Sequence, residues 1–310
     1  MTTIKVLFVG LGSIGTRHLK NLNEITKKKN ISLTVDALRY NDRKLADETA
    51  NLLNCQYYNT DVLPSYDIIF ITNPTNLHFE IIKELSGKTN CFFIEKPIFN
   101  NINNTIEEAG LIGKKAYIAC PMRFCKTYIE LKKLISNYNI YSARVICSSY
   151  LPEWRKGVDY RNVYSAKKEM GGGVTIDLIH EWDYLIDLFG FPIESYNLKG
   201  KYSHLEINSD DISIYIAKYE NLLAEIHLDY IGRGYRRSIE LLTKQGNIIA
   251  DFGKGTITLP DDTILNYEED VNRRYIREME YFIDYALNSK NNSINSPQMA
   301  YDTLKVTLGE

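Results

Sequence analysis

The chain has 310 residues, of which 44% are hydrophobic, 37 are Lys or Arg and 39 are Asp or Glu. At about 100–200 residues per domain, this length suggests two domains, and the ordinary globular composition argues against long disordered regions. The balanced charge lacks the basic stripe of nucleic-acid-binding proteins, and no run approaches the ~20 apolar residues of a membrane span. We therefore expect no nucleic-acid partner and no membrane association.

The five cysteines form an odd set without a Cys-x-x-Cys pair. Disulfide frameworks and zinc sites need paired or closely spaced cysteines, so neither is indicated and we expect no metal site. The N-terminus leads directly into a strand-like segment, without the features of a signal peptide. Together these observations predict a cytoplasmic protein with reduced thiols.

Apolar, strand-like runs alternate with helical patterns over the first 120 residues. Strands alternating with helices of about ten to fifteen residues are typical of an α/β fold with a doubly wound parallel sheet. The strands are expected at 4–9, 31–38, 67–72, 91–95 and 116–120, and the helices at about 14–25, 42–53, 75–86 and 104–114.

The pattern changes after about residue 120, where a helix around 129–135 precedes closely spaced strands. Such strands, without crossover helices between them, predict an antiparallel meander. Its strands are expected at 142–150, 194–203, 212–219, 222–230, 236–243 and 247–252, with further helices at 174–188 and about 271–287.

A G-x-G-x-x-G motif stands directly after the first strand and opens the first helix. Its first glycine permits a tight turn, its second lets the backbone approach a pyrophosphate, and its third allows close helix–strand packing. The helix N-terminus also faces the phosphate charge. In this context the motif predicts a dinucleotide site, and a glycine-rich turn without ligand is the alternative. The residues concerned are Gly10, Gly12, Ser13, Ile14 and Gly15.

The residue that ends the second strand distinguishes NAD from NADP, because an acid binds the ribose 2′-hydroxyl and an arginine accommodates a 2′-phosphate. Asp36 lies inside the expected strand, whereas Arg39 falls nearest its carboxyl end, with Arg43 one helical turn further on. This arrangement slightly favours NADP. Ordinary solvated arginines are the alternative, so NAD stays open.

Glu95, Lys96 and Pro97 follow the buried strand at 91–95. Proline has no N–H to continue the ladder, so the strand stops there. A lysine at the carboxyl end of a parallel strand points into the crevice where ligands bind, and partial desolvation lets it exchange protons near neutrality. Lys96 is therefore a candidate catalytic residue, and a plain strand exit is the alternative.

Three features in this order resemble the glucose–fructose oxidoreductase / inositol dehydrogenase (Gfo/Idh/MocA) family. They are the G-x-G-x-x-G, the E-K-P at 95–97, and the triple glycine at 171–173 with Asp and His on the next helix. The segment 72–78 is similar to the family's T-P-x-x-x-H, which borders the cofactor, and Arg123 with Phe124 resembles its R-F. The resemblance covers nearly the whole chain.

The resemblance implies a Rossmann domain, placed at 1–121, and an α+β domain for substrate binding and oligomerisation at 122–310. The large, open, mainly antiparallel sheet of this second domain is expected to serve oligomer formation. It implies NAD(P)-dependent oxidation or reduction of a hydroxyl-bearing carbon in a sugar or cyclitol, with Lys96 catalytic. Beyond the glycine motif, the cofactor-binding candidates are Arg39, Thr72, Asn73, Pro74, His78 and Glu95.

Asp177 and His180 are three residues apart after the triple glycine, so they are expected on one helix face. A carboxylate can fix the tautomer of an imidazole and raise its basicity, and His180 can then take the hydroxyl proton as hydride leaves the adjacent carbon. Many family members have the two residues four apart, so this spacing leaves the partner of His180 open. A structural histidine is the alternative.

Residues 150–173 form a long, polar, aromatic loop, and such loops in compact domains are usually functional. Its aromatic rings suit a sugar, and its paired arginines suit a carboxylate or phosphate, with intramolecular salt bridges as the alternative. The segment resembles a branch of the family associated with bacterial surface-carbohydrate synthesis, which implies an anionic or nucleotide-linked sugar. The substrate-binding candidates are Lys96, Arg123, Trp154, Arg155, Tyr160, Arg161 and Tyr184.

The leading interpretation is a sugar dehydrogenase in which Lys96 and His180 meet where the two domains face each other and handle the hydroxyl proton. Two alternatives are a non-catalytic NAD(P)-sensing regulator on the same fold, which the presence of both residues disfavours, and an oxidoreductase of a non-sugar substrate. The strands between about 200 and 260 outnumber the helices that can cover them, which predicts a homodimer or homotetramer built through this region.

Overall fold

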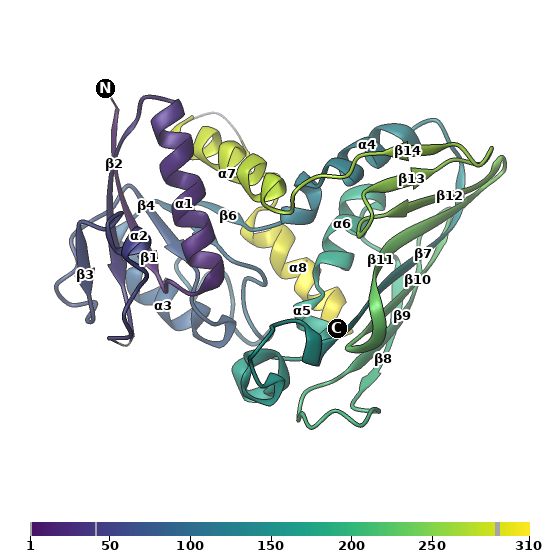
Figure 1. Ribbon diagram of the computed structural model, residues 1–310, viewed down its shortest axis with the longest axis horizontal. Helices are drawn as coiled ribbons and strands as arrows, with labels where there is room; N and C mark the ends of the chain where they lie inside the picture. Colours follow the sequence, from purple (N-terminus) through teal and green to yellow (C-terminus); the bar gives the residue numbers. More distant parts are fainter. Residues whose placement is uncertain (1, 41, 289–291) are drawn as a thin grey trace. The chain divides into compact units, whose positions relative to one another are not determined.

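The computed structural model describes residues 2–40, 42–288 and 292–310. It divides into two compact units, each with its own sheet (Figure 1): Met1–Ala119 with Tyr275–Asp302, and Cys120–Arg274 with Thr303–Glu310. The sequence analysis placed everything after residue 121 in one domain, whereas the structure returns the segment 275–302 to the first unit.

The first unit contains, among its described residues, a six-stranded parallel sheet in the order β3-β2-β1-β4-β5-β6. This confirms the predicted doubly wound fold. The chain runs outward from the central β1 to β3 and then returns to the other side of β1. The strand order therefore reverses between β1 and β4. Ligands bind at this point of reversal in such sheets. The strands are β1 (Thr3–Val9), β2 (Ser32–Leu38), β3 (Cys55–Tyr57), β4 (Ile68–Ile71), β5 (Cys91–Ile94) and β6 (Lys115–Ile118).

The C-terminal segment joins the first unit because it covers the apolar sheet. Phe282 of α7 (Asn272–Leu287) is fully buried, and its ring lies 5.4 Å from that of Phe70 and 5.0 Å from that of Phe93. The hydroxyl of Tyr117 on β6 donates to Glu278 of the same helix at 2.8 Å. The other helices of this unit are α1 (Ser13–Lys28), α2 (Asp47–Ala50) and α3 (His78–Leu85).

Two expected helices of the first unit differ from the structure. The pattern at 42–53 yields only the short α2 among the described residues, and turns replace the helix expected at 104–114. Gly110 and Gly113 adopt φ values of 72° and 75°, in the left-handed region that ends helices. The apolar periodicity there reflects packing of turns rather than a helix.

The second unit contains, within the described ranges, an eight-stranded sheet in the order β14-β13-β12-β11-β7-β10-β9-β8. It is mainly antiparallel, as predicted, but it is not a simple meander because β7 lies between β10 and β11 and runs parallel to β10. The strands are β7 (Ile140–Tyr150), β8 (Glu194–Gly200), β9 (Ile212–Lys218), β10 (Leu223–Asp229), β11 (Ile231–Thr243), β12 (Gly246–Asp251), β13 (Thr256–Thr258) and β14 (Ile264–Asn266).

Helices cover one face of this sheet (Figure 1). Several apolar side chains of β8 and β9, such as Leu198 and Ile216, are exposed. On the covered face, Trp182 is fully buried and packs edge-on against Tyr215 of β9, with ring centroids 5.2 Å apart. The helices are α4 (Lys126–Ile135), α5 (Val174–Asp177) and α6 (His180–Phe189), and the boundary between the units at 302/303 falls within α8 (Pro297–Leu308).

Short 3-10 helices fill several connections. In the described part of the chain, no helix has both the length and the apolar character needed to cross a membrane. The 3-10 helices are η1 (Thr75–Leu77), η2 (Ser86–Lys88), η3 (Pro121–Phe124), η4 (Leu151–Glu153), η5 (Tyr160–Asn162), η6 (Tyr164–Ala166) and η7 (Lys168–Met170).

Candidate active site

The glycine motif forms the turn from β1 into α1. A side chain at Gly15 would place its Cβ 2.5 Å from the carbonyl oxygen of Gly10, so this glycine is required for packing inside the protein. Gly12, the N-cap of α1, is different because a Cβ there would meet no atom within 4 Å. Ser13 and Ile14 follow in the accessible first turn. The space at Gly12 fits a close approach of a phosphate group to the helix N-terminus.

The turn after β4 faces the glycine motif. Thr72 donates its hydroxyl to the carbonyl oxygen of Gly10 at 2.6 Å, which fixes the two turns together. Asn73 is only 8% exposed, yet among the residues that the structure describes neither its amide nitrogen nor its amide oxygen has a hydrogen-bond partner. Within the same residues, the side-chain oxygen of Asn76 is likewise buried and unpartnered. Because an unsatisfied buried polar group costs ~1–3 kcal/mol, these amides fit a polar ligand such as NAD(P). The sequence analysis missed Asn76.

His78 is buried beneath this turn and contacts its backbone. Its imidazole is fully buried, with Nε2 3.1 Å from the carbonyl oxygen of Asn73 and Nδ1 3.1 Å from that of Pro97. Burial lowers the pKa of His78, although the neighbouring carbonyl oxygens oppose the shift. The side chain therefore contacts the backbone of both turns, and we assign it a positioning role rather than direct contact with a cofactor.

Glu95 connects the first helix to the end of β5. The Nε2 atom of His18 donates to Glu95 at 2.6 Å, and the other carboxylate oxygen accepts from the backbone N–H of Lys96 at 3.2 Å. Burial opposes ionisation of Glu95, but the hydrogen bond and charge of His18, with the charge of Lys96, lower its pKa overall. The contact fixes the backbone that carries Lys96, whose side chain is partly exposed. His18 was not among the sequence candidates.

Arg39 directly follows β2, as expected, and its side chain is buried. The guanidinium donates to Oε1 of Gln56 at 2.8 Å and to the carbonyl oxygen of Arg43. Asp36 stays within the strand and accepts from the hydroxyl of Tyr66 at 3.0 Å. The residue at the carboxyl end of β2 is thus a cation whose orientation is already fixed by the surrounding chain.

The segment after the triple glycine differs from the expected continuous helix at 174–188. α5 ends at Asp177 and α6 begins at His180, with Leu178 and Ile179 outside both helices. A Cβ at Gly172 would lie 2.0 Å from the carbonyl oxygen of Tyr164, so the loop packs tightly onto the glycine run. Asp177 and His180 therefore do not share one helix face, which corrects the sequence-based expectation.

Asp177 is buried beneath this loop, with only 4% of its surface exposed. Tyr164 donates its hydroxyl to one carboxylate oxygen, and Tyr230 donates to the other at 2.5 Å. Burial, and then the charge of Asp177, raise the pKa of both phenols, so both stay protonated and act as donors at neutral pH. Neither tyrosine was a sequence candidate.

The long loop contains both accessible and internally bonded side chains. Trp154 packs edge-on against Tyr230, with centroids 5.2 Å apart, and donates its indole N–H to Ser149 at 3.0 Å. Arg155 is exposed, and its positive charge acts on the phenol of Tyr164. Within the described residues no hydrogen bond or ion pair engages the Arg155 guanidinium. His180 is partly exposed.

Two other loop candidates are engaged within the protein. The guanidinium of Arg161 donates to Asp159 at 2.9 Å and to Glu206 at 3.0 Å. The hydroxyl of Tyr160 accepts from the backbone N–H of Glu206 at 3.2 Å. The structure therefore favours the salt-bridge alternative for Arg161 and a structural role for Tyr160.

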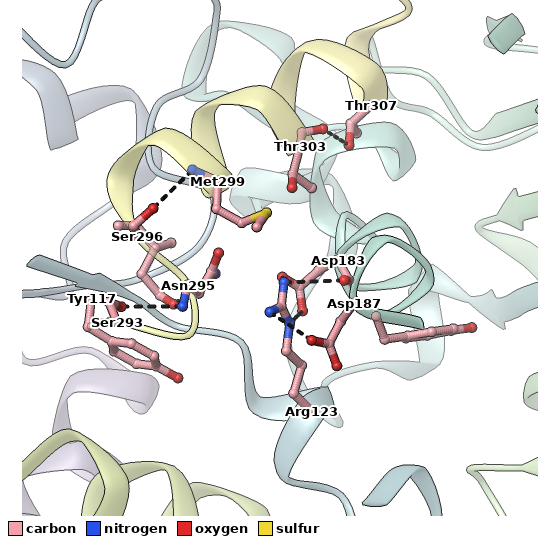
Figure 2. Close-up of polar contacts among 12 residues, drawn as sticks. Tyr117, Arg123, Asp183, Asp187, Ser293, Asn295, Ser296, Met299, Thr303 and Thr307 are labelled. Atoms are coloured by element: carbon pink, nitrogen blue, oxygen red, sulfur yellow. Dashed lines mark hydrogen bonds and ion pairs between the residues drawn. The ribbon is translucent and has the colours of Figure 1, made fainter. Parts of the chain in front are cut away.

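Two further substrate-binding candidates lie in the core of the second unit. Figure 2 shows the Arg123 guanidinium against Asp183 and Asp187, with bonds of 2.7 and 3.0 Å to the Asp183 carboxylate and 3.3 Å to that of Asp187. Tyr184 is fully buried, with its ring centroid 5.3 Å from that of Phe252. We therefore correct both assignments to structural roles. Among the described residues, no cluster of His, Cys, Asp and Glu is arranged to hold a metal.

Comparisons with known proteins agree with this architecture. Residues 4–116 match the GFO_IDH_MocA model, described as an oxidoreductase family with an NAD-binding Rossmann fold. The chain is 24% identical to myo-inositol 2-dehydrogenase of Thermotoga maritima over 305 residues, covering 90% of this chain and 87% of that protein.

Solved structures show the same two-unit fold. A levoglucosan dehydrogenase in complex with NADH and levoglucosan matches with a TM-score of 0.81 at 13% identity, covering 99% of this chain and 96% of that one. Myo-inositol 2-dehydrogenase from Lactobacillus plantarum matches with a TM-score of 0.79 at 19% identity, covering 99% and 95%. At these identities the likeness shows the fold alone.

Proposed function

We propose that this chain, which belongs to the Gfo/Idh/MocA family of NAD-binding oxidoreductases, transfers hydride between a nicotinamide and a hydroxyl-bearing carbon of a sugar or sugar derivative. The observation that carries the proposal is the strand-order reversal of the first sheet, where Gly12 leaves open space and the buried amide of Asn73 has no hydrogen-bond partner in the described part of the chain. The relatives named for inositol and levoglucosan support a sugar or polyol as the substrate class.

Lys96 and His180 handle the proton of the reacting hydroxyl. The bound nicotinamide supplies the redox chemistry, and the protein orients the reactants and moves the proton. A neutral His180 accepts the hydroxyl proton as the carbon loses hydride, while the Lys96 ammonium stabilises the developing negative charge on the oxygen. The backbone of Lys96 is held by Glu95, which His18 anchors in turn.

The substrate is proposed to carry a negative charge, as an anionic or nucleotide-linked sugar does. Arg161 is already paired with Asp159 and Glu206, so Arg155 is the loop arginine that supports this proposal. Its neighbour Trp154 presents a partly exposed ring suited to stacking on a sugar. The guanidinium of Arg155 is free to form two parallel bonds to a carboxylate or phosphate.

A substrate screen tests this function directly. The purified protein is incubated with nucleotide sugars, sugar acids, free sugars and polyols, each with NAD and with NADP, and nicotinamide absorbance is followed. We expect turnover of at least one sugar. Tight NAD(P) binding without turnover of any substrate would instead support a nicotinamide-sensing regulator, and turnover of non-sugar substrates alone would reassign the substrate class.

Arg39→Asp is expected to shift cofactor preference from NADP towards NAD. We propose that the Arg39 guanidinium contacts the 2′-phosphate, and loss of such a charge-assisted contact, ~1.5–3 kcal/mol, corresponds to about a tenfold to hundredfold weaker affinity. Titration calorimetry with both cofactors measures the change. Lys27→Asp, at the other end of α1, is the control for altered charge. Unchanged NADP affinity in the Arg39 variant would exclude Arg39 from the site.

The open face of the second sheet is proposed as a homodimer or homotetramer interface. Ile216 and Ile214 of β9 are 56% and 41% exposed beside Tyr196 and Leu198 of β8. Exposed apolar side chains that lie together are typical of interfaces. The surface thus extends to β8, beyond the expected range of about 200–260.

Replacing Ile214 and Ile216 by lysine is expected to convert the oligomer to monomers, because two buried charges would face each other across the interface. Light scattering at micromolar concentration gives the mass. Ile112→Lys is the matched control, since Ile112 is 69% exposed in the first unit. A monomeric wild type, or an oligomer unaffected by the double substitution, would contradict the proposal.

A further inference from the structure

Two tyrosines contact Asp177 from different parts of the second unit. Tyr164 comes from η6 in the long loop, and Tyr230 lies between β10 and β11 at the end of the sheet. Each hydroxyl donates to a different oxygen of the same carboxylate. A carboxylate with one donor on each oxygen has a fixed plane as well as a fixed position, because rotation about its bonds would break both contacts.

The two donors are themselves fixed. The Tyr230 ring is fully buried and packs against Trp154, while the backbone of Tyr164 is held against the glycine run at 172. Burial keeps both phenols protonated, so neither serves as a base near neutral pH. Their contribution is therefore orientation of the carboxylate rather than proton transfer.

The break between α5 and α6 explains why the two tyrosine contacts with Asp177 matter. A continuous helix would place Asp177 and His180 by backbone geometry alone, but here Leu178 and Ile179 separate α5 from α6. The helical backbone fixes the Cα of Asp177 but leaves rotation about the side-chain bonds open, so side-chain contacts supply the constraint on the carboxylate. Tyr164 and Tyr230 provide it from outside the helical segment.

We propose that Tyr164 and Tyr230 are positioning residues that hold the Asp177 carboxylate in the orientation needed for turnover. The inference rests on the proposed function, in which His180 accepts the hydroxyl proton, together with the sequence-based hypothesis that the Asp177 carboxylate tunes that imidazole. It adds two residues, each more than ten positions from Asp177 in the sequence, whose effect on the reaction passes entirely through Asp177.

Tyr164→Phe and Tyr230→Phe test the proposal. Each is expected to lower kcat by about tenfold to hundredfold, the effect of a small misplacement of a reacting group. The KM for the cofactor is expected to stay within about twofold, because neither hydroxyl is needed to hold the dinucleotide. Combining either change with Asp177→Ala, which removes both contacts, is expected to lower kcat no further than Asp177→Ala alone, since residues that act as a unit are not additive.

Tyr128→Phe is the matched control. Tyr128 is buried in the same unit and also donates its hydroxyl to a carboxylate, that of Asp187. It has no part in the proposed chemistry, so the loss of its hydroxyl is expected to lower Tm by about 2–4 °C, as for one buried hydrogen bond. We expect its kcat to change by less than about twofold. A loss of kcat in this variant as large as that in Tyr164→Phe and Tyr230→Phe would overturn the proposal. A general loss of rigidity in the second unit would then explain the lowered kcat of all three variants.

Thermal unfolding separates this inference from the proposed function. If the wild type turns over no sugar, the proposed function fails, but a double variant of Asp177→Ala and Tyr230→Phe still reports on the contact. A Tm loss in the double variant no larger than that of Asp177→Ala shows that Tyr230 acts through Asp177. Additive losses in Tm, or a kcat unchanged by both tyrosine substitutions, would overturn the inference.

Discussion

Lys96→Ala and His180→Ala are each expected to lower kcat by about 10²–10⁴-fold, the usual contribution of a positioned acid or base. Cofactor affinity is expected to change little, because in the proposed site the glycine turn and the amides after β4 hold the dinucleotide. The double variant is expected to be little worse than the worse single one, since residues that serve one proton transfer act as a unit. Steady-state kinetics with the substrate found by screening, and calorimetry with the cofactor, provide the two measurements.

Controls for this prediction come from residues of the same type. Lys133 is an exposed lysine of α4, and His204 is an exposed histidine whose ring approaches the hydroxyl of Tyr150. Alanine at either position is expected to leave kcat within about twofold, as is usual for surface substitutions. Full activity in Lys96→Ala or in His180→Ala would remove that residue from the proton transfer.

Asp177→Asn is expected to cost less than loss of His180. The amide keeps one acceptor oxygen, so one of the two tyrosine contacts survives, whereas the negative charge that we propose to raise the basicity of the His180 imidazole is lost. Comparing kcat of the two variants on one substrate checks the order. A larger loss for Asp177→Asn would indicate that the carboxylate itself takes part in the proton transfer.

The strands of the first unit were predictable because they are buried on both faces. Ile68–Ile71 and Cys91–Ile94 are short, continuous apolar runs, as expected for parallel strands covered by helices on both sides. β3 was missed because its three residues are largely exposed and carry no such signal. The packing of α7 against the first sheet was also missed. The contacts of Phe282 with Phe70 and Phe93 join segments far apart in the sequence, and a local pattern does not predict them.

In the second unit, the sequence pattern predicts where strands lie but not which strands pair. Alternation of buried and exposed residues located β9 and β10, but it contains no information on the neighbour with which each strand pairs. The insertion of β7 between β10 and β11 depends on contacts across about 80 residues of chain, such as Ala224 with Ala143. Local sequence favours the simpler meander, which the structure does not adopt.

The site was predictable where a residue's place in the chain decides its environment. Gly12, Arg39 and Lys96 each follow a strand of the parallel sheet, at the edge where ligands bind in such sheets. Arg123 and Tyr184 were misassigned because a helical or turn position does not say which way a side chain faces. Tyr230 and His18 were missed because their partners lie 53 and 77 residues away.

Gly12→Val is expected to weaken NAD(P) binding by more than about 100-fold, equivalent to ~2.7 kcal/mol or more. Gly12 has a φ of −75° and a ψ of −166°, an extended conformation that valine adopts without strain, and its Cβ would meet no protein atom within 4 Å. The new side chain would instead occupy the space that the pyrophosphate needs. Calorimetry with NAD and NADP measures the loss, and Tm reports whether the fold is intact.

Two other glycines separate loss of binding from loss of structure. Gly87 also has open space around its Cβ, so Gly87→Val is expected to change neither Tm nor affinity. Gly15→Ala would bring a methyl group to 2.5 Å from the Gly10 carbonyl oxygen, so it is expected to lower Tm as well as affinity. Gly12→Val alone is expected to lose affinity at an unchanged Tm. Unchanged affinity in that folded variant would mean that the dinucleotide does not approach the backbone at Gly12, and the cofactor site would have to lie elsewhere.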